Sequence, residues 1–134
     1  MSNAVPFILS IIILSLIATI MIGLYGIVGR PNLVKKLIAL TILGDTTNLL
    51  VILLGYRSIY PVMPPILPDL SKEALSQLIS TAVDPLPQAL VITAVVIGMA
   101  VNVLLAFAII QIYRLYGTVD TRELQQELLG GGER

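Results

Sequence analysis

The residue of this sequence best suited to chemistry is Asp45, a lone acid within an apolar run. No other charge lies between Leu37 and Leu54. Holding a carboxylate near the centre of a bilayer costs on the order of 3 kcal/mol on insertion scales. Low-dielectric surroundings favour the neutral form of a carboxyl group, so such a group can take up and release a proton, or bind a cation. An acid in this setting is a functional candidate by default.

Hydroxyl and amide side chains cluster around this acid at helical spacing. Thr41 lies four residues before Asp45 and Asn48 three residues after it, which places all three on one helix face. Thr46 and Thr47 add further oxygens nearby. The face formed by Thr41, Asp45, Thr47 and Asn48 predicts a path for protons or cations. The alternative is a structural ion pair, in which Asp45 binds a Lys or Arg of another subunit.

Small residues form two further stripes. One recurs at four-residue spacing through the last apolar run and consists of Ala94, Gly98, Asn102 and Ala106. Such a smooth stripe favours close packing against another helix, and the amide of Asn102 is also a candidate for the ion path. A second stripe consists of Ser15, Thr19 and Gly23. We interpret it as a packing surface as well.

Three long apolar runs must carry these residues, over about 6–29, 33–54 and 86–113. A bilayer core needs about 20 residues of helix, so each run is long enough to span it. Hydrophobic residues make up 57% of the 134 and charged residues 12%, against about 25% charged in soluble domains. The sequence therefore predicts an all-α integral membrane protein. We expect a three-helix transmembrane domain over residues 1–116 and a cytoplasmic tail over residues 117–134.

The long loop over residues 55–84 has a structure of its own. Its first half is stiffened by Pro61, Pro64, Pro65 and Pro68. Ser71 then predicts the cap of a short helix over 72–82, lying on the outer membrane surface or against a partner. The apolar face of that helix consists of Leu75, Leu78, Ile79 and Ala82. Asp84 followed by Pro85 is typical of a helix start, here of the third span.

Lysine and arginine predict the orientation in the membrane. Six lie in the first connection and the tail, and two in the long loop: Arg30, Lys35, Lys36, Arg114, Arg122 and Arg134 against Arg57 and Lys72. Because cytoplasmic loops carry the excess of basic residues, we expect the N-terminus outside the cell and the C-terminus in the cytoplasm. We expect Lys35 and Lys36 to extend toward lipid headgroups.

The tail predicts one more short helix. Asp120 and Glu123 have the spacing of a capping box, and the run from Gly130 to Gly132 is a suitable end.

Several classes of function are excluded by composition. The sequence contains no Cys and no His, which excludes disulfides, thiolate nucleophiles, haem ligation by His and Ser-His-Asp triads. Its formal net charge is zero, so it does not attract nucleic acids. We expect no catalytic residue, no metal site and no cofactor on this chain.

The stretch from Asp84 to Gly98, DPLPQALVITAVVIG, resembles the signature of the C subunit of Mrp/Mnh multisubunit cation/proton antiporters. Those subunits are similar to the three-helix NuoK subunit of respiratory complex I. The basic entry over Asn32–Lys36 and the polar stretch over Gly44–Leu50 also match this layout. The resemblance covers about residues 26–116.

The resemblance implies a place beside larger antiporter-like subunits, along an axis on which protons and Na⁺ move. It implies two hosts, a free-standing Na⁺/H⁺ antiporter or the ion-pumping arm of a membrane-bound hydrogenase or sulfane reductase. NuoK-type subunits carry one acid in the second helix and another in the third. Here Asp45 matches the first, and the third helix reads Ala100, Val101, Asn102, so a two-acid relay within this chain is not expected.

Two rival functions remain open at this point. The chain is either part of the ion path or a structural transmembrane spacer that joins larger subunits. A small homo-oligomeric transporter is a third alternative. An oxidoreductase host would carry its redox centres on other chains, because this chain has no Cys to bind iron–sulfur clusters.

Overall fold

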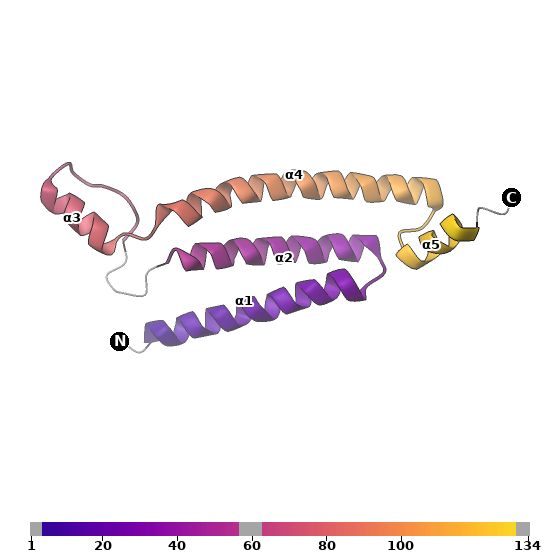
Figure 1. Cartoon of the computed structure of the whole chain (residues 1–134), viewed down its shortest axis with the longest axis horizontal. Coiled ribbons are helices and arrows are strands. Elements are labelled where there is room, and N and C mark those ends of the chain that lie inside the picture. The colour runs from indigo at the N-terminus through magenta and orange to yellow at the C-terminus, as the bar shows by residue number, and fades with distance from the viewer. Residues whose placement is uncertain (1–3, 57–62, 131–134) are drawn as a thin grey trace.

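The protein is a thin layer of long helices with a shorter helix at each end (Figure 1). The structure, a computed structural model, describes residues 4–56 and 63–130. Its helices are α1 (Ala4–Gly29), α2 (Leu33–Leu54), α3 (Lys72–Thr81), α4 (Pro85–Tyr116) and α5 (Thr121–Gly130). By length and composition α1, α2 and α4 can each cross a membrane. The predicted fold class is therefore confirmed, and the described residues form no strand beyond two isolated bridges.

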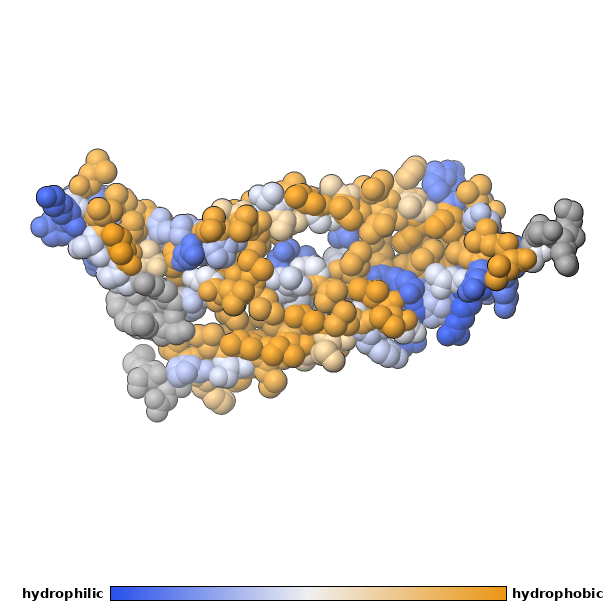
Figure 2. All heavy atoms as spheres, viewed as in Figure 1, coloured by the Kyte–Doolittle hydropathy of each residue, from blue (hydrophilic) through white to orange (hydrophobic). Residues whose placement is uncertain are grey.

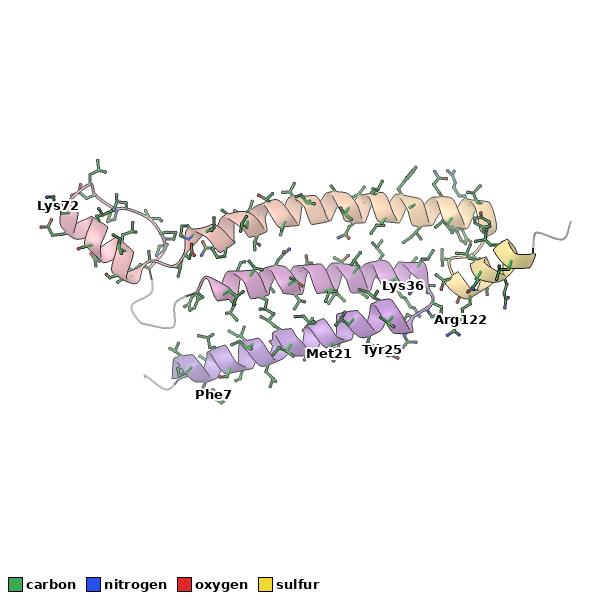
Figure 3. The ribbon with its side chains drawn as sticks, viewed as in Figure 1. Phe7, Met21, Tyr25, Lys36, Lys72 and Arg122 are labelled. Carbon is green, nitrogen blue, oxygen red and sulfur yellow. The ribbon has the colours of Figure 1, made fainter. Side chains whose placement is uncertain are left out.

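The three long helices lie in one row, with α2 in the middle (Figure 1). α2 packs against both α1 and α4. A layer one helix thick buries little, and among the described residues the buried hydrophobic side chains are Ala39, Val83 and Val91. Phe7, Met21 and Tyr25 lie on the side of α1 that faces away from α2, and each is about two-thirds exposed (Figure 3). Such a surface requires lipid or other protein around it.

The contact between α1 and α2 is made by small residues. Gly23 is buried, and a Cβ built there would lie 3.2 Å from the Cβ of Leu43. At Gly26 a Cβ would lie only 2.6 Å from the Cβ of Ala39. The two backbones can approach this closely only because Gly26 has no side chain. Gly23, which the sequence placed in a small-residue stripe, is part of this contact.

The turn between α1 and α2 is held by side chains from the start of α2. The Asn32 Oδ1 accepts hydrogen bonds from the N–H groups of Val34 and Lys35, at 3.0 and 3.2 Å, and so caps α2. The Lys36 Nζ donates a 2.7 Å hydrogen bond to the carbonyl of Ile27, in the last turn of α1 (Figure 3). A cation at this helix end is favourable. The Lys36 ammonium therefore binds within the chain, whereas Lys35 is exposed; contact of these lysines with headgroups stays a prediction.

The long loop contains the predicted short helix. The Ser71 Oγ accepts a 3.2 Å hydrogen bond from the Ala74 N–H at the start of α3, which confirms the predicted cap. The Asp84 Oδ1 accepts a 2.9 Å hydrogen bond from the Leu86 N–H at the start of α4, as predicted. The predictions that involve Arg57 and Pro61 lie outside the described residues, as do those that involve Gly131, Gly132 and Arg134.

The tail folds back against the turn between α1 and α2. Gly117 ends α4 with φ +71°, a left-handed conformation that favours glycine. The Leu33 N–H then donates to the Val119 carbonyl (2.9 Å) and the Thr121 N–H to the Pro31 carbonyl (3.0 Å). We call this pairing of residues 31–33 with 119–121 the latch. It fixes α5 to the end of the helical hairpin.

The start of α5 differs from the predicted capping box. The Asp120 Oδ1 accepts from the Arg122 N–H at 2.8 Å, so Asp120 does cap the first turn. The Glu123 carboxylate, however, accepts a hydrogen bond from the Thr118 hydroxyl instead of the Asp120 N–H. The Thr118 Oγ1 itself accepts from the Asp120 N–H at 3.2 Å. The Thr118 hydroxyl thus accepts from the Asp120 N–H in place of the Glu123 carboxylate, because the left-handed turn at Gly117 brings Thr118 close to the start of α5.

Candidate functional site

The candidate site is a groove between α2 and α4, halfway along the spanning helices. It has a volume of about 780 Å³. Its polar lining residues are Thr41, Asp45, Thr47, Asn48 and Asn102, and its apolar lining includes Leu43, Ala94 and Val101. Figure 2 shows an opening between the two helices with hydrophilic atoms at its edges. All five residues predicted for the ion path thus lie around one groove.

The helical periodicity of α2 separates a packed face from a polar face. Ala39 and Thr46 are buried at 6% and 5% exposure, and Ala39 belongs to the face that contacts α1. Asp45 is one residue before Thr46 and therefore points about 100° away, toward α4. The Thr46 hydroxyl donates to the Ile42 carbonyl at 2.6 Å and does not line the groove. The prediction that Thr46 adds an oxygen near Asp45 is therefore wrong.

Hydrogen bonding decides what the threonines offer to the groove. The Thr41 hydroxyl donates to the Leu37 carbonyl at 3.0 Å, and the Thr47 hydroxyl donates to the Leu43 carbonyl at 2.7 Å. Each hydroxyl has a single proton, so both threonines present only lone pairs to the groove. An ionised Asp45 likewise only accepts. Together these side chains form an acceptor-rich surface, which suits a cation or a proton-donating group.

The Asp45 carboxylate is not neutralised inside this chain. No hydrogen bond or ion pair to Asp45 is formed by residues 4–56 and 63–130, and its side chain is exposed in the groove. Asn48 and Asn102 line the same groove from opposite helices. Their amides are the groups within the groove that can donate a hydrogen bond as well as accept one. The described residues of this chain therefore offer the carboxylate no partner of opposite charge.

The small-residue stripe of α4 faces the groove. Ala94, Gly98 and Asn102 line it, whereas Ala106 does not. A Cβ built at Gly98 would meet no atom within 4 Å. The close helix contact predicted from Ala94, Gly98 and Ala106 is thus not made at Gly98 within this chain, and packing against another subunit stays a prediction. Because Ala94 and Gly98 have small or no side chains, they leave space open on the α4 side of the groove.

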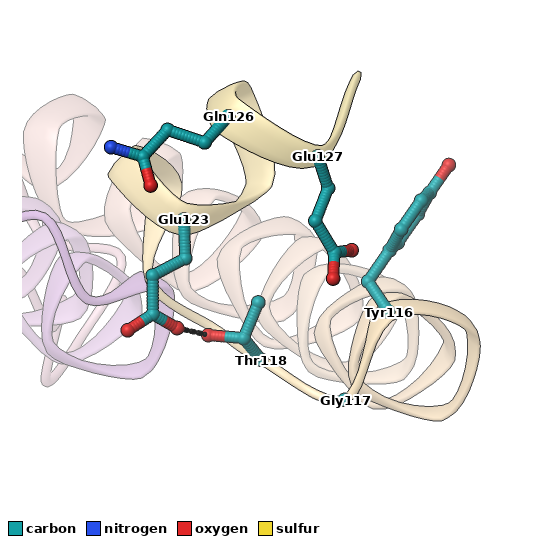
Figure 4. Close-up of a pocket in the computed structure, with 6 residues that line it drawn as sticks. All are labelled: Tyr116, Gly117, Thr118, Glu123, Gln126 and Glu127. Carbon is teal, nitrogen blue, oxygen red and sulfur yellow. Dashed lines mark hydrogen bonds between the residues drawn. The ribbon is translucent and has the colours of Figure 1, made fainter. Parts of the chain in front are cut away.

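A second polar pocket lies at the junction of α4 and α5. Its volume is about 510 Å³, and it is lined by Tyr116, Gly117, Thr118, Glu123, Gln126 and Glu127 (Figure 4). Tyr116 is the last residue of the third candidate span and the other lining residues follow it, so this pocket lies at the end of the spanning region. Among the described residues no group of three or more His, Cys, Asp or Glu is placed to hold a metal ion. We therefore take the groove as the site.

Sequence reasoning found the acid and its neighbours but missed the contacts that hold them. The latch joins residues far apart along the chain, and the Lys36–Ile27 bond joins α1 and α2 across their turn; neither has a periodic signal in the sequence. The Gly26–Ala39 contact did have one, because Gly23 and Gly26 are three residues apart on one helix face.

Several known proteins are similar to this chain in sequence or in structure. An uncharacterized protein of Methanocaldococcus jannaschii is 34% identical over 108 residues, which is 81% of this chain and 80% of that protein. A protein of Staphylococcus saprophyticus named "Putative antiporter subunit mnhC2" is 32% identical over 114 residues, 85% of each chain. A chain in the structure of the membrane-bound sulfane sulfur reductase, an archaeal respiratory membrane complex, is 40% identical. The match has a TM-score of 0.69 and covers 84% of this chain and 94% of that chain.

The predicted resemblance to NuoK-like C subunits of Mrp/Mnh antiporters is therefore confirmed. The spanning helices and these relatives make the protein a multi-pass membrane protein. The model of the family described as NADH-ubiquinone/plastoquinone oxidoreductase chain 4L matches residues 11–127. Because that match includes both walls of the groove, the latch and most of α5, the chain belongs to this family.

Proposed function

We propose that this protein is a subunit of a hetero-oligomeric complex in the cell membrane, and that its α2–α4 groove forms part of a proton or cation path. The observation that carries the proposal is one carboxylate, Asp45, without a partner among the described residues, beside acceptor oxygens of Thr41 and Thr47. They lie in an open groove halfway along α2 and α4. Asp45 is the site that takes up and releases a proton or binds the cation.

The groove can form only one side of an ion path, and neighbouring subunits must form the rest. The layer is one helix thick, and α2 is bounded by α1 on one side and by the groove on the other. Lipid against the groove would leave Asp45 in hydrocarbon at a cost of about 3 kcal/mol. Neighbouring membrane subunits that close the groove around water avoid this cost, so we infer that other subunits, besides lipid, are its partners.

The relatives suggest two hosts for the chain. One carries the name of an antiporter subunit, and the other is part of a respiratory sulfane sulfur reductase complex. In both we propose Na⁺ and H⁺ as the transported ions. Purifying the intact complex through a tag on this chain and identifying its members by mass spectrometry would distinguish an antiporter from a complex with redox subunits.

We further propose that the N-terminus and α3 lie outside the cell and that α5 lies in the cytoplasm. The start of α1 and α3 are at one end of the layer and α5 is at the other (Figure 1). Because the chain contains no Cys, single cysteines can test this directly. A membrane-impermeant maleimide should label Lys72→Cys in intact cells and Glu127→Cys only in inverted vesicles.

The ion-path proposal is tested by Asp45→Asn in the intact complex. This change keeps size and hydrogen bonding but removes the charge and the titration. We expect Na⁺-driven proton movement in inverted vesicles to fall about tenfold or more, because removing the acid abolishes the proton-carrying group. Asp45→Glu should retain most activity. Thr46→Val is the matched control, since Thr46 lies outside the groove, and it should transport at the wild-type rate.

The same variants separate the path from a structural spacer. Assembly is followed by native gel electrophoresis of the complex. A complex that assembles with Asp45→Asn and transports at the wild-type rate would refute the ion-path proposal. If the Asp45→Asn complex falls apart while the Asp45→Glu complex assembles, the result would support a structural ion pair as the role of this acid.

A further inference from the structure

The loop between α2 and α4 forms a preorganised protrusion over residues 63–83, which we call the knob. The Met63 N–H donates to the Thr81 carbonyl and the Val83 N–H donates to the Met63 carbonyl, both at 3.1 Å. At its base the Asp84 N–H donates to the Gly55 carbonyl at 3.3 Å. The entry and exit of the knob are therefore tied together, and the knob is fixed to the ends of α2 and α4.

One face of α3 is covered within the knob itself. A pocket of about 230 Å³ is bounded on the helix side by Ala74, Gln77, Leu78 and Thr81, and on the other side by Met63, Pro64, Ile66 and Pro68. The prolines hold this second side extended. The apolar face predicted from sequence is thus divided, and Leu78 points into the knob.

The rest of that apolar face is exposed, together with the tip. Leu70 is 93% exposed, Ile66 68% and Leu75 49%. Leu70 is two residues before Lys72 in the sequence, and Figure 3 shows Lys72 at the far tip of the molecule. Figure 2 shows apolar atoms at this tip beside hydrophilic ones. Exposed apolar side chains gathered on one protrusion mark a candidate contact surface.

Position and charge indicate what covers the knob. α3 lies beyond the ends of α1, α2 and α4 (Figure 1). We infer that it is outside the hydrocarbon layer of a membrane that these three helices cross. Helices that bind membrane surfaces carry Lys and Arg on the polar face. The knob instead carries Asp69 and Glu73 against one cation, Lys72, so it lacks the basic charge that binds anionic headgroups. These features favour a protein surface whose rim is basic.

We propose that the knob docks on the extramembrane surface of a neighbouring subunit, with Leu70 inserted into an apolar pocket bordered by basic residues. Preorganisation by the two backbone bonds and the prolines lowers the entropy lost on docking. Leu70 acts as the anchor, and Asp69 and Glu73 meet the basic rim. This interaction is independent of the ion path, since none of these residues lines the groove.

A photo-cross-linking experiment on the intact complex tests the proposal. Leu70→Cys creates a single thiol in a chain without Cys, and benzophenone maleimide attached to it reports what lies within its reach. We expect a cross-link to one partner subunit, at a peptide with Lys or Arg near apolar residues. The matched control is Ser76→Cys on the polar face of α3, which should give about fivefold less of that product because rim contacts are sparser.

Other cross-linked products would overturn the proposal. Lipid adducts as the main product would show that the knob lies on the membrane, and a cross-link to a second copy of this chain would show self-association. Leu70→Asp should also speed loss of the partner on native gels about tenfold, the usual effect of removing an anchor residue, with Leu70→Met near wild type. Unchanged partner retention in Leu70→Asp would refute the anchor role, and the Asp45 result would be unaffected.

Discussion

Gly26 of α1 lies directly against Ala39 of α2, at a distance that leaves no space for a methyl group on Gly26. A Cβ at residue 26 would be 2.6 Å from the Ala39 Cβ. Ala39 is also one of the few buried apolar residues of the chain. This pair sets the spacing of α1 and α2, and the helical periodicity of α2 places Asp45 on another face, toward α4.

Gly26→Ala should therefore destabilise the helical hairpin by about 1–3 kcal/mol, the usual cost of overpacking a tight contact. The measurement is the thermal stability of the purified complex. Ala39→Gly in the same chain moves the methyl group to the other helix and should restore much of the loss. Gly44→Ala is the control, because nothing lies within 4 Å of a Cβ there; equal effects at residues 26 and 44 would contradict the close contact.

Lys36 and Lys35 should differ although they are neighbours. Lys36→Met removes the cation that binds the Ile27 carbonyl at the C-terminal end of α1, and should cost about 1–2 kcal/mol of stability. Lys35→Met removes an exposed cation at the same depth and should change stability by less than about 0.5 kcal/mol. Thermal unfolding of the two variants compares them, and indistinguishable values would show that Lys36 only contacts headgroups.

A large side chain at Gly98 should block the groove without disturbing the fold. Space is open above this residue on the groove side of α4, so Gly98→Leu fills the path rather than a packed core. We expect assembly to persist and Na⁺-driven proton movement to fall about tenfold, because an apolar constriction excludes water. Val103→Leu adds bulk at an exposed position that does not line the groove, and it should transport normally. Wild-type transport in Gly98→Leu would place the ion path elsewhere.

The latch should depend on Gly117, the left-handed residue that ends α4 two residues before the latch segment 119–121. Gly117 has φ +71°, and an alanine there costs about 1–2 kcal/mol. Opening of the latch would free α5, in which Arg122 is a trypsin site. We expect Gly117→Ala to speed cleavage at Arg122 about fivefold or more, through local unfolding. Gly130→Ala, at the other end of α5, should leave the cleavage rate unchanged.

A side chain within the latch offers a second measurement of it. The Thr121 hydroxyl donates to the Pro31 carbonyl at 2.9 Å, beside the backbone bond from the same residue. Thr121→Val removes only the side-chain bond, worth about 1 kcal/mol, and should speed trypsin cleavage less than Gly117→Ala does. Protection unchanged in both variants would mean that α5 is held by contacts other than the latch.

Hydrophobic patterning determined the helices and the site-bearing faces from the sequence. Runs of more than 20 apolar residues form helices in a membrane because their backbone groups have no other partners there. The caps at Ser71 and Asp84 follow from short side chains that accept N–H groups locally. For the same reason of local geometry, a spacing of three and four residues sufficed to place Thr41, Asp45 and Asn48 on one face.

Tertiary structure alone decided which neighbour each face meets. Periodicity cannot show that Thr46 is buried on the packed side while Thr47 lines the groove, or that the stripe through Gly98 faces open space instead of a helix. Nor does it show that the Lys36 ammonium donates a hydrogen bond to the Ile27 carbonyl, or that residues 119–121 pair with residues 31–33 between α1 and α2. These contacts depend on how closely the helices and their connections approach one another in space, which is set by the fit of small residues such as Gly26 and Ala39. The pattern within one helix does not give that distance.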